Sequence, residues 1–198
     1  VYYAVDNGAK VINMSFGKSF SPHSEWVRDA IAYAAKKDVL IVAAAGNDSK
    51  NTDNNSYYPN DQMGTGEEVS DSFLIVGATS YNYGAGIVSG FSNYGNSSVD
   101  LFAPGSQIYS CYPDDKYEFN SGTSMAAPLV TGIAALIFSQ YPKLSAAQVK
   151  QILMASGLPI VKKVSLSDET FIPFAELSRS GRLVNAYNAL IMASKISK

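Results

Sequence analysis

The stretch Val39-Leu40-Ile41-Val42-Ala43-Ala44-Ala45 contains no polar residue and ends at Gly46-Asn47. An apolar run without alternation is typical of a strand covered on both faces, as in a parallel sheet. Other short apolar segments share this character, and segments with helical periodicity lie between them. We expect strands at Lys10–Ser15, Phe73–Thr79 and Val99–Ala103, and helices at Ser24–Lys36, Ser124–Gln140, Ser145–Ala155 and Gly181–Ser194. This alternation predicts an α/β fold with a parallel sheet, organised as one domain.

The two helices after residue 123 carry distinct signals. The first has an apolar stripe at helical spacing, formed by Met125, Leu129, Ile133, Leu136 and Ile137. Pro128 is tolerated there because it lies in the first turn. Ser145 and Gln148 match a capping box that begins the second helix. The pattern of residues 158–180 is mixed, and we interpret them as a loop or hairpin inserted into the domain.

Composition limits the classes of function. Of the 198 residues 46% are apolar and 16% charged, which is typical of a globular chain and not of a disordered one. The net charge is −2 with no basic block, so we expect no nucleic-acid partner. No apolar run approaches 18 residues, so we expect no membrane-spanning segment. Cys111 is the single cysteine, which excludes an intrachain disulfide, and we expect it to pack on a strand.

Ser124 is the residue that is most clearly placed to act as a nucleophile. It follows Gly122-Thr123 and enters the first turn of an apolar helix. Backbone N–H groups are unpaired there and the helix dipole is positive, so a developing oxyanion would be stabilised. Taken one by one, these residues also have plain structural interpretations. Ser124 could be a helix-capping serine, Asn47 a turn residue and Ala43–Ala45 a core strand.

Four segments, taken together and in order, resemble the subtilisin-like serine proteases (the subtilase family, peptidase S8). They are Ile12–Gly17 (INMSFG), Val42–Asn47 (VAAAGN), Phe102–Gly105 (FAPG) and Gly122–Pro128 (GTSMAAP). The resemblance runs from Val1 to Ala155 and resumes at Gly181–Ala186. It implies a three-layer fold with a parallel sheet, of which residues 1–198 form the C-terminal portion of one peptidase domain. We therefore expect the domain's N-terminal strands and helices to be absent from this chain.

The resemblance also implies roles for individual residues. Ser124 would be the catalytic nucleophile, forming an acyl-enzyme on a polypeptide substrate, and the side-chain amide of Asn47 would complete the oxyanion hole. The remaining roles concern substrate binding. Ser15, Phe16 and Gly17 would pair with the substrate backbone, and Ala44, Ala45 and Gly46 would form a wall of the primary specificity pocket.

Two members of the family's catalytic triad have no counterpart here. The Asp-Ser/Thr-Gly and His-Gly-Thr-His motifs are missing, and the single histidine, His23, follows the substrate strand instead of preceding it. We expect His23 to be exposed near a helix N-terminus. The fragment is then a serine endopeptidase by family but inactive alone. The alternative is a degenerate peptide-binding or assembly module. An unrelated α/β hydrolase is disfavoured because its nucleophile lies in the pattern Gly-x-Ser-x-Gly, whereas Met125-Ala126 follows the serine here.

Further expectations follow from the resemblance. No cofactor is required, but Asp100 matches a position that binds Na⁺ or Ca²⁺ in some relatives, together with carbonyls near Tyr58. Asp48 or Asp53 either lies at the rim of the specificity pocket, favouring basic residues, or is a solvated loop carboxylate. The strand at Lys10–Ser15 would lack its neighbour, so the isolated chain should self-associate. An extracytoplasmic or secreted location is favoured.

Overall fold

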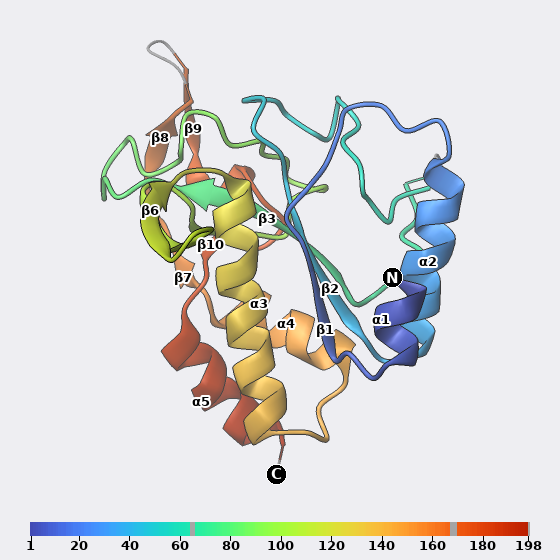
Figure 1. Cartoon of the computed structure of the whole chain (residues 1–198). Helices are drawn as coiled ribbons and strands as arrows, with labels where there is room; N and C mark the ends of the chain where they lie inside the picture. The colour runs from blue at the N-terminus through green and yellow to red at the C-terminus, as the bar shows by residue number, and fades with distance from the viewer. Residues whose placement is uncertain (64–65, 167–169, 198) are drawn as a thin grey trace.

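A six-stranded sheet is the centre of the computed structural model, which describes residues 1–63, 66–166 and 170–197 (Figure 1). Its strand order is β1-β2-β3-β4-β10-β7. All neighbours pair in parallel except β10 and β7, which are antiparallel. The strands are β1 (Val11–Met14), β2 (Leu40–Ala44), β3 (Phe73–Thr79), β4 (Leu101–Pro104), β7 (Leu158–Pro159) and β10 (Arg182–Leu183). The predicted α/β fold is confirmed.

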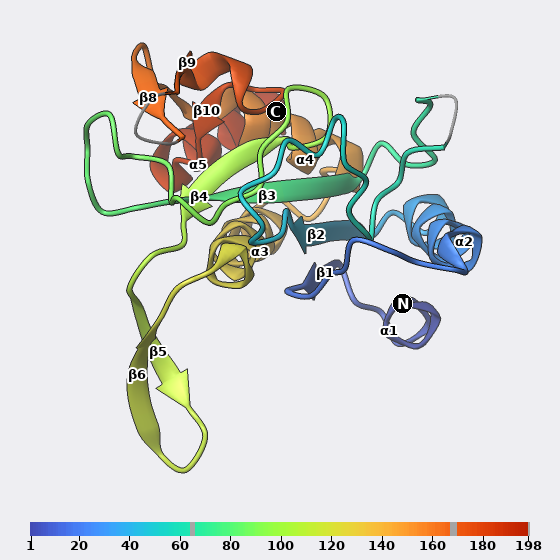
Figure 2. The same cartoon turned by 90° about the horizontal axis from the view of Figure 1, so that it is seen from above.

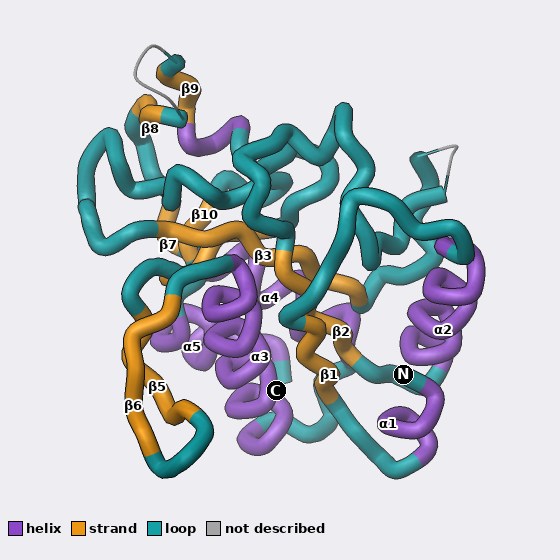
Figure 3. The backbone as a smooth tube through the Cα atoms, turned by 45° about the horizontal axis from the view of Figure 1, so that its top comes forward, coloured by secondary structure: helices purple, strands orange, loops and turns teal. Residues whose placement is uncertain are grey.

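The sheet is the middle of three layers because alternate residues of each strand point to opposite faces. On one face Leu40, Val42 and Leu74 pack against α3 (Thr123–Gln140), α4 (Ala146–Ser156) and α5 (Ala186–Ile196). On the other, Ile41 and Phe73 pack against α1 (Tyr2–Asp6) and α2 (Ser24–Lys36). Figures 1, 2 and 3 show these two groups of helices on opposite sides of the strands.

The apolar stripe predicted for α3 is right at Ile137 and wrong at Leu129 and Leu136, whose side chains are 40% and 43% exposed. The buried residues of the helix are Thr123, Ala126, Ala127, Val130, Ala134, Ile137 and Phe138. Small alanines face the sheet because they let the helix backbone approach β1 to β4, all of which α3 contacts. Because the helix is apolar nearly all round, periodicity could not identify its inward face.

Helix α3 also bears on the expectation that the chain has no membrane-spanning segment. By length and composition alone, Thr123–Gln140 is apolar enough to cross a bilayer. Core helices pass the same test, and α3 packs against four strands of the sheet. The expectation rested on uninterrupted apolar runs and overlooked a helix in which hydroxyl residues interrupt the run.

The chain after Gly181 does not form the single helix that we expected. Arg182 and Leu183 form strand β10, in which Leu183 pairs with Phe102 of β4. The helix begins only after Asn185, whose Oδ1 accepts a hydrogen bond from the backbone N–H of Asn188 (2.8 Å). Sheet pairing and this N-cap together delay the helix. Residues before it follow expectation: β8 (Lys163–Ser165) and β9 (Phe171–Pro173) form a hairpin, followed by the short 3₁₀ helix η1 (Phe174–Glu176).

An unpredicted hairpin immediately precedes α3. Strands β5 (Ile108–Tyr112) and β6 (Lys116–Asn120) pair in antiparallel fashion and project from the body of the molecule (Figure 2). Asp114 and Asp115, both with positive φ (64° and 55°), form its turn. Cys111 lies on β5 but is exposed, so the expectation that it packs against its surroundings is wrong.

A cluster of charged groups is buried beneath the end of the sheet. Lys150 Nζ donates to the carbonyl of Phe73 (2.6 Å) and lies 3.4 Å from Asp100 Oδ1. Asp100 Oδ2 accepts from the backbone N–H of Ile75 (2.7 Å), and Arg179 Nη1 lies 3.8 Å from Asp100 Oδ1. One buried cation, Lys150, and one partly exposed cation, Arg179, thus face one buried carboxylate. This arrangement satisfies the carboxylate, which would be costly to bury unpaired.

Near this cluster, Asp61 is a buried carboxyl group without an ion pair among the residues described. Its side chain is only 4% exposed, and Oδ2 has no hydrogen-bond partner among the residues described. Burial, and secondarily the nearby charge of Glu68, raises its pKa from 3.8 to about 7. The folded protein therefore favours the neutral carboxyl group at mildly acidic pH.

We expect the isolated chain to self-associate through β1, which pairs only with β2 among the described strands and forms an edge of the sheet. Asn13→Lys places a charge on the exposed middle of this strand and should lower the apparent mass at high protein concentration. Asn82→Lys, in an exposed loop, is the matched control. Size-exclusion chromatography with light scattering measures both. A monomeric wild-type chain at all concentrations would contradict the prediction.

We also expect Asp61 to make stability depend on pH. The folded state retains the Asp61 proton between about pH 4 and 7, where the unfolded chain has released it. The free energy of unfolding should therefore fall as the pH rises through this window, by at most ~1.4 kcal/mol per pH unit. Asp61→Asn should remove that slope, whereas Asp71→Asn, at an exposed position, should retain it. Urea unfolding at several pH values tests this, and identical profiles for wild type and Asp61→Asn would refute it.

Candidate active site

Ser124 is the second residue of α3 and is held against the chain that leaves β1. Its Oγ donates a hydrogen bond to the carbonyl of Ser15 (3.1 Å), and Ser15 Oγ donates to the carbonyl of Ser124 (2.8 Å). This reciprocal pair joins residues 109 positions apart in the sequence. The structure thus brings the predicted nucleophile and the predicted substrate-binding segment together.

Asn47 lies beside the same helix terminus, and Thr123 fixes its orientation. Asn47 Oδ1 accepts hydrogen bonds from the backbone N–H of Thr123 (2.9 Å) and from its Oγ1 (3.0 Å). Thr123 Oγ1 in turn accepts from the backbone N–H of Gly46 (3.1 Å). With its oxygen engaged in this way, the Asn47 side chain directs its NH₂ group elsewhere. Our sequence reasoning missed Thr123, although it stands inside the GTS motif.

Two hydrogen-bond donors flank one small space next to Ser124. A Cβ atom added to Gly122 would lie 3.5 Å from Asn47 Nδ2 and 3.6 Å from the backbone nitrogen of Ser124. In the described part of the chain neither nitrogen has an acceptor. Gly122 therefore leaves open a space in which both N–H groups could donate to a single oxygen. The positive end of the helix dipole favours a negative charge at this point.

The segments predicted to bind substrate form two walls beside this space. One is Ser15–Gly17, where Phe16 is 63% exposed and Gly17 leads into a bridge between Lys18 and Tyr58. The other is Ala44–Gly46, which is buried. The sequence interpretation did not identify Tyr57, although its ring lies against both Gly17 and Gly46. The polar loop around it gave no sign of this contact.

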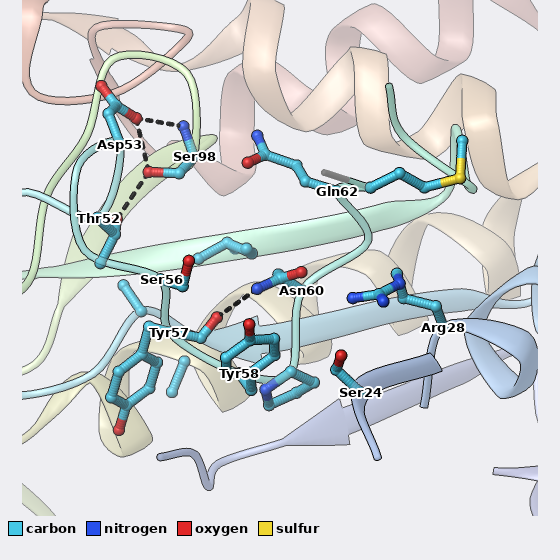
Figure 4. A pocket seen from close by; sticks show the side chains of 15 residues that line it. Ser24, Arg28, Thr52, Asp53, Ser56, Tyr57, Tyr58, Asn60, Gln62 and Ser98 are labelled. Carbon is cyan, nitrogen blue, oxygen red and sulfur yellow. Dashed lines mark hydrogen bonds between the residues drawn. The ribbon is translucent and has the colours of Figure 1, made fainter. Parts of the chain in front are cut away.

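Behind the second wall lies a pocket of about 290 Å³, shown in Figure 4. Arg28, Asn60 and Gln62 contribute polar groups to it. Asp53 lines this pocket, and its Oδ1 accepts from Ser98 Oγ (2.7 Å) and from two backbone N–H groups. Asp48 lines a second pocket, which shares Tyr57 with the first. Burial, and then the charge of Asp48, raises the pKa of the Tyr57 phenol.

The site holds no base next to Ser124 in the described residues. His23 precedes α2, where its ring stacks on Trp26 (centroids 4.3 Å apart), and Nδ1 lies 3.7 Å from Glu25 Oε1. Its side chain is 59% exposed, as we expected. Among the residues that the structure describes, the carbonyl of Ser15 is therefore the one acceptor of a hydrogen bond from the Ser124 hydroxyl. An unionised serine with this partner is a weak nucleophile.

Asp100, our candidate for cation binding, lies away from Ser124 in the cluster with Lys150 and Arg179. The side chains there supply two positive groups to the carboxylate. Among the residues described, no group of three or more His, Cys, Asp or Glu side chains could hold a metal ion.

The comparisons with known proteins agree with this geometry. The model of the Subtilase family matches residues 1–172. Subtilisin DY of Bacillus licheniformis is 38% identical over 158 residues, covering 79% of this chain and 53% of its own length. Thermitase of Thermoactinomyces vulgaris is 41% identical over 141 residues, covering 71% and 44%. The chain thus spans about half the length of these curated relatives.

Solved structures show the same relationship. The prenylagaramide maturation protease PagA superposes with a TM-score of 0.74 at 29% identity, over 96% of this chain and 64% of its own. A chain from the study of subtilase cytotoxin SubAB assembly gives a TM-score of 0.75 at 26% identity, over 95% and 59%. With a family model covering most of the sequence and the motif segments assembled around Ser124, this chain belongs to the subtilase family of serine proteases.

Proposed function

We propose that this chain carries the nucleophile, oxyanion hole and part of the substrate cleft of a serine endopeptidase. The observation that carries the proposal is the convergence of Asn47 Nδ2 and the Ser124 backbone nitrogen on one space beside the Ser124 hydroxyl. When a serine oxygen attacks a peptide carbonyl, the carbonyl oxygen becomes negatively charged. Two N–H donors aimed at that oxygen stabilise the tetrahedral intermediate. Collapse of this intermediate would break the peptide C–N bond, release the amine after it has received a proton from the catalytic histidine, and leave the acyl group on Ser124 as an acyl-enzyme.

The substrate that suits this cleft is a polypeptide in extended conformation. Ser15–Gly17 continues from β1, an edge strand of the sheet. Such a segment can bind the backbone of a peptide through strand addition, while side chains of the peptide enter adjacent pockets. The hydrogen bonds between Ser15 and Ser124 would keep this peptide next to the nucleophile.

Alone, the chain should not turn over substrate. Acylation needs a base to take the Ser124 proton, and within these 198 residues the single histidine is exposed beside Trp26. In subtilisin, a member of this family, loss of the catalytic histidine lowers kcat by roughly 10⁶-fold. Peptidase activity therefore requires a histidine and a carboxylate from outside this stretch of sequence.

A second candidate function is peptide binding without catalysis. The hydrogen bond from Ser124 Oγ to the Ser15 carbonyl favours it, because this bond leaves the hydroxyl group unactivated. Against it, a binding module needs neither a serine at a helix start nor a free pair of oxyanion donors. We therefore retain the peptidase fragment as the principal proposal.

Labelling with a fluorophosphonate tests the role of Ser124. Without a base, the purified chain should react at least ~10⁴-fold more slowly than intact thermitase, because loss of a triad member lowers kcat in subtilisin by roughly 10⁴- to 10⁶-fold. Any slow labelling should disappear in Ser124→Ala and persist in Ser139→Ala, a matched change at the far end of α3. Labelling of the wild-type chain at the rate of thermitase would contradict the proposal that the base is missing.

Binding of a cleavage product tests the oxyanion hole. The peptide acetyl-Ala-Ala-Ala-Ala with a free C-terminal carboxylate should place an oxygen between Asn47 Nδ2 and the Ser124 nitrogen. Asn47→Ala should raise its Kd about 10-fold or more, because a hydrogen bond to a charged group contributes ~1.5–3 kcal/mol. Asn55→Ala, an exposed asparagine of the following loop, is the matched control. Calorimetric titration in which Asn47→Ala binds as tightly as wild type would remove the role assigned to Asn47.

A further inference from the structure

The slot between the two walls of the cleft is already occupied by a side chain of the protein itself. We infer that the ring of Tyr57 closes this slot, so that the site accepts only a small side chain on the peptide residue whose carbonyl reaches Ser124. Tyr57 is then a specificity-determining residue, selecting glycine, alanine or serine over aromatic, long aliphatic or basic residues. The inference rests on the proposed function, since it assumes that a peptide occupies the cleft.

The position of the ring follows from the two glycines that touch it. A Cβ atom added to Gly17 would lie 2.3 Å from Tyr57 Cε1, and one added to Gly46 would lie 2.6 Å from Tyr57 Cζ. Each wall therefore has a glycine, and so no side chain, at the position where the Cε1–Cζ edge of the Tyr57 ring lies. With any larger residue at either glycine, the ring could not occupy this position.

The slot opens beside the nucleophile and so receives the side chain of the attacked residue. Ser15, two residues before Gly17, exchanges two hydrogen bonds with Ser124. Gly46 directly precedes Asn47, whose amide flanks the oxyanion space. A carbonyl held in that space lies between the two walls, and the side chain on the same residue projects into the gap between them. The first group it would meet there is the Tyr57 ring.

Hydrogen bonds on both sides of Tyr57 hold its backbone in place. Asn60 Nδ2 donates to the Tyr57 carbonyl (2.7 Å), as the dashed line in Figure 4 shows. Tyr58 exchanges two backbone hydrogen bonds with Lys18, each 2.9 Å, which tie this segment to the wall that contains Gly17. In the same view the Tyr57 ring points away from Arg28 and Gln62 of the neighbouring pocket. Removing the ring from the slot would therefore require a side-chain rotation against its packing.

Charge near the slot does not reverse this preference. Hydrogen bonds from Ser97 and Ser98 hold Asp53 Oδ1 at the margin of the neighbouring pocket, and Asp53 is not among the atoms nearest to a Cβ added at Gly17 or Gly46. Asp48 is close enough to influence Tyr57, but a lysine or arginine side chain would have to pass the ring to reach the interior of the slot. A small uncharged side chain meets neither obstacle.

The test uses the 198-residue chain and three peptides, acetyl-Ala-Ala-Ala-X with a free carboxylate, in which X is Ala, Phe or Lys. Isothermal titration should give the wild-type chain a Kd at least 10-fold lower for Ala than for Phe or Lys. Tyr57→Gly should open the slot and bring the Phe peptide to an affinity equal to or better than that of the Ala peptide. Tyr57→Phe keeps the ring and should keep the wild-type order.

The outcomes separate this inference from the proposed function. If peptides bind but wild type does not prefer Ala, or if folded Tyr57→Gly keeps the wild-type order, Tyr57 is not the determinant and the cleft stands. If no peptide binds to any folded variant, the peptide cleft itself is refuted, and the inference with it. Should Tyr57→Gly fail to fold by circular dichroism, Tyr57→Leu removes the ring with a smaller loss of volume and should narrow the preference for Ala over Phe, and an unchanged preference in folded Tyr57→Leu would overturn the inference.

Discussion

The Thr123 side chain joins the two parts of the molecule from which the site is made. Its hydroxyl group accepts a hydrogen bond from Gly46 at the end of β2 and donates one to Asn47, while its own N–H is the first donor of α3. The side chain is fully buried, so these bonds are shielded from water. Through this one residue the terminus of the central helix is set against the carboxyl end of a central strand. The orientation of the Asn47 amide and the position of Ser124 both depend on it.

The same junction shows what the chain contributes to catalysis and what it lacks. Electrostatic stabilisation of an oxyanion requires fixed donors, and those are in place at Asn47 and at the start of α3. Removal of a proton from Ser124 requires a base, and the hydroxyl group instead donates to the carbonyl of Ser15. A base that reached Ser124 would have to replace that carbonyl as the hydrogen-bond acceptor. In the proposed function, Ser124 is thus a nucleophile that is positioned but not activated.

Sequence patterns predicted well those parts of the fold in which local signals and packing agree. The bounds of α2 and β3 match their predictions, and the capping box of Ser145 and Gln148 forms as expected. Prediction failed where burial was decided by neighbours distant in sequence. The inward face of α3 includes three alanines because the sheet lies close to it, and Arg182–Leu183 became a strand because β4 offered an edge. The β5–β6 hairpin, exposed except at its half-buried ends Ile108 and Asn120, carries no burial pattern by which it could be recognised.

By itself, the sequence determined the fold class and the family, and it pointed to Asn47 and Ser124 as the reactive residues, because apolar strands and the motifs around these two residues are contiguous in the chain. Only the tertiary structure decided how these residues act on one another. The orientation of the Asn47 amide depends on Thr123, 76 positions away, and the closure of the slot depends on a tyrosine that meets two glycines from different segments. Such contacts are set by how the segments pack, and packing distances between remote segments leave no local pattern in a single sequence.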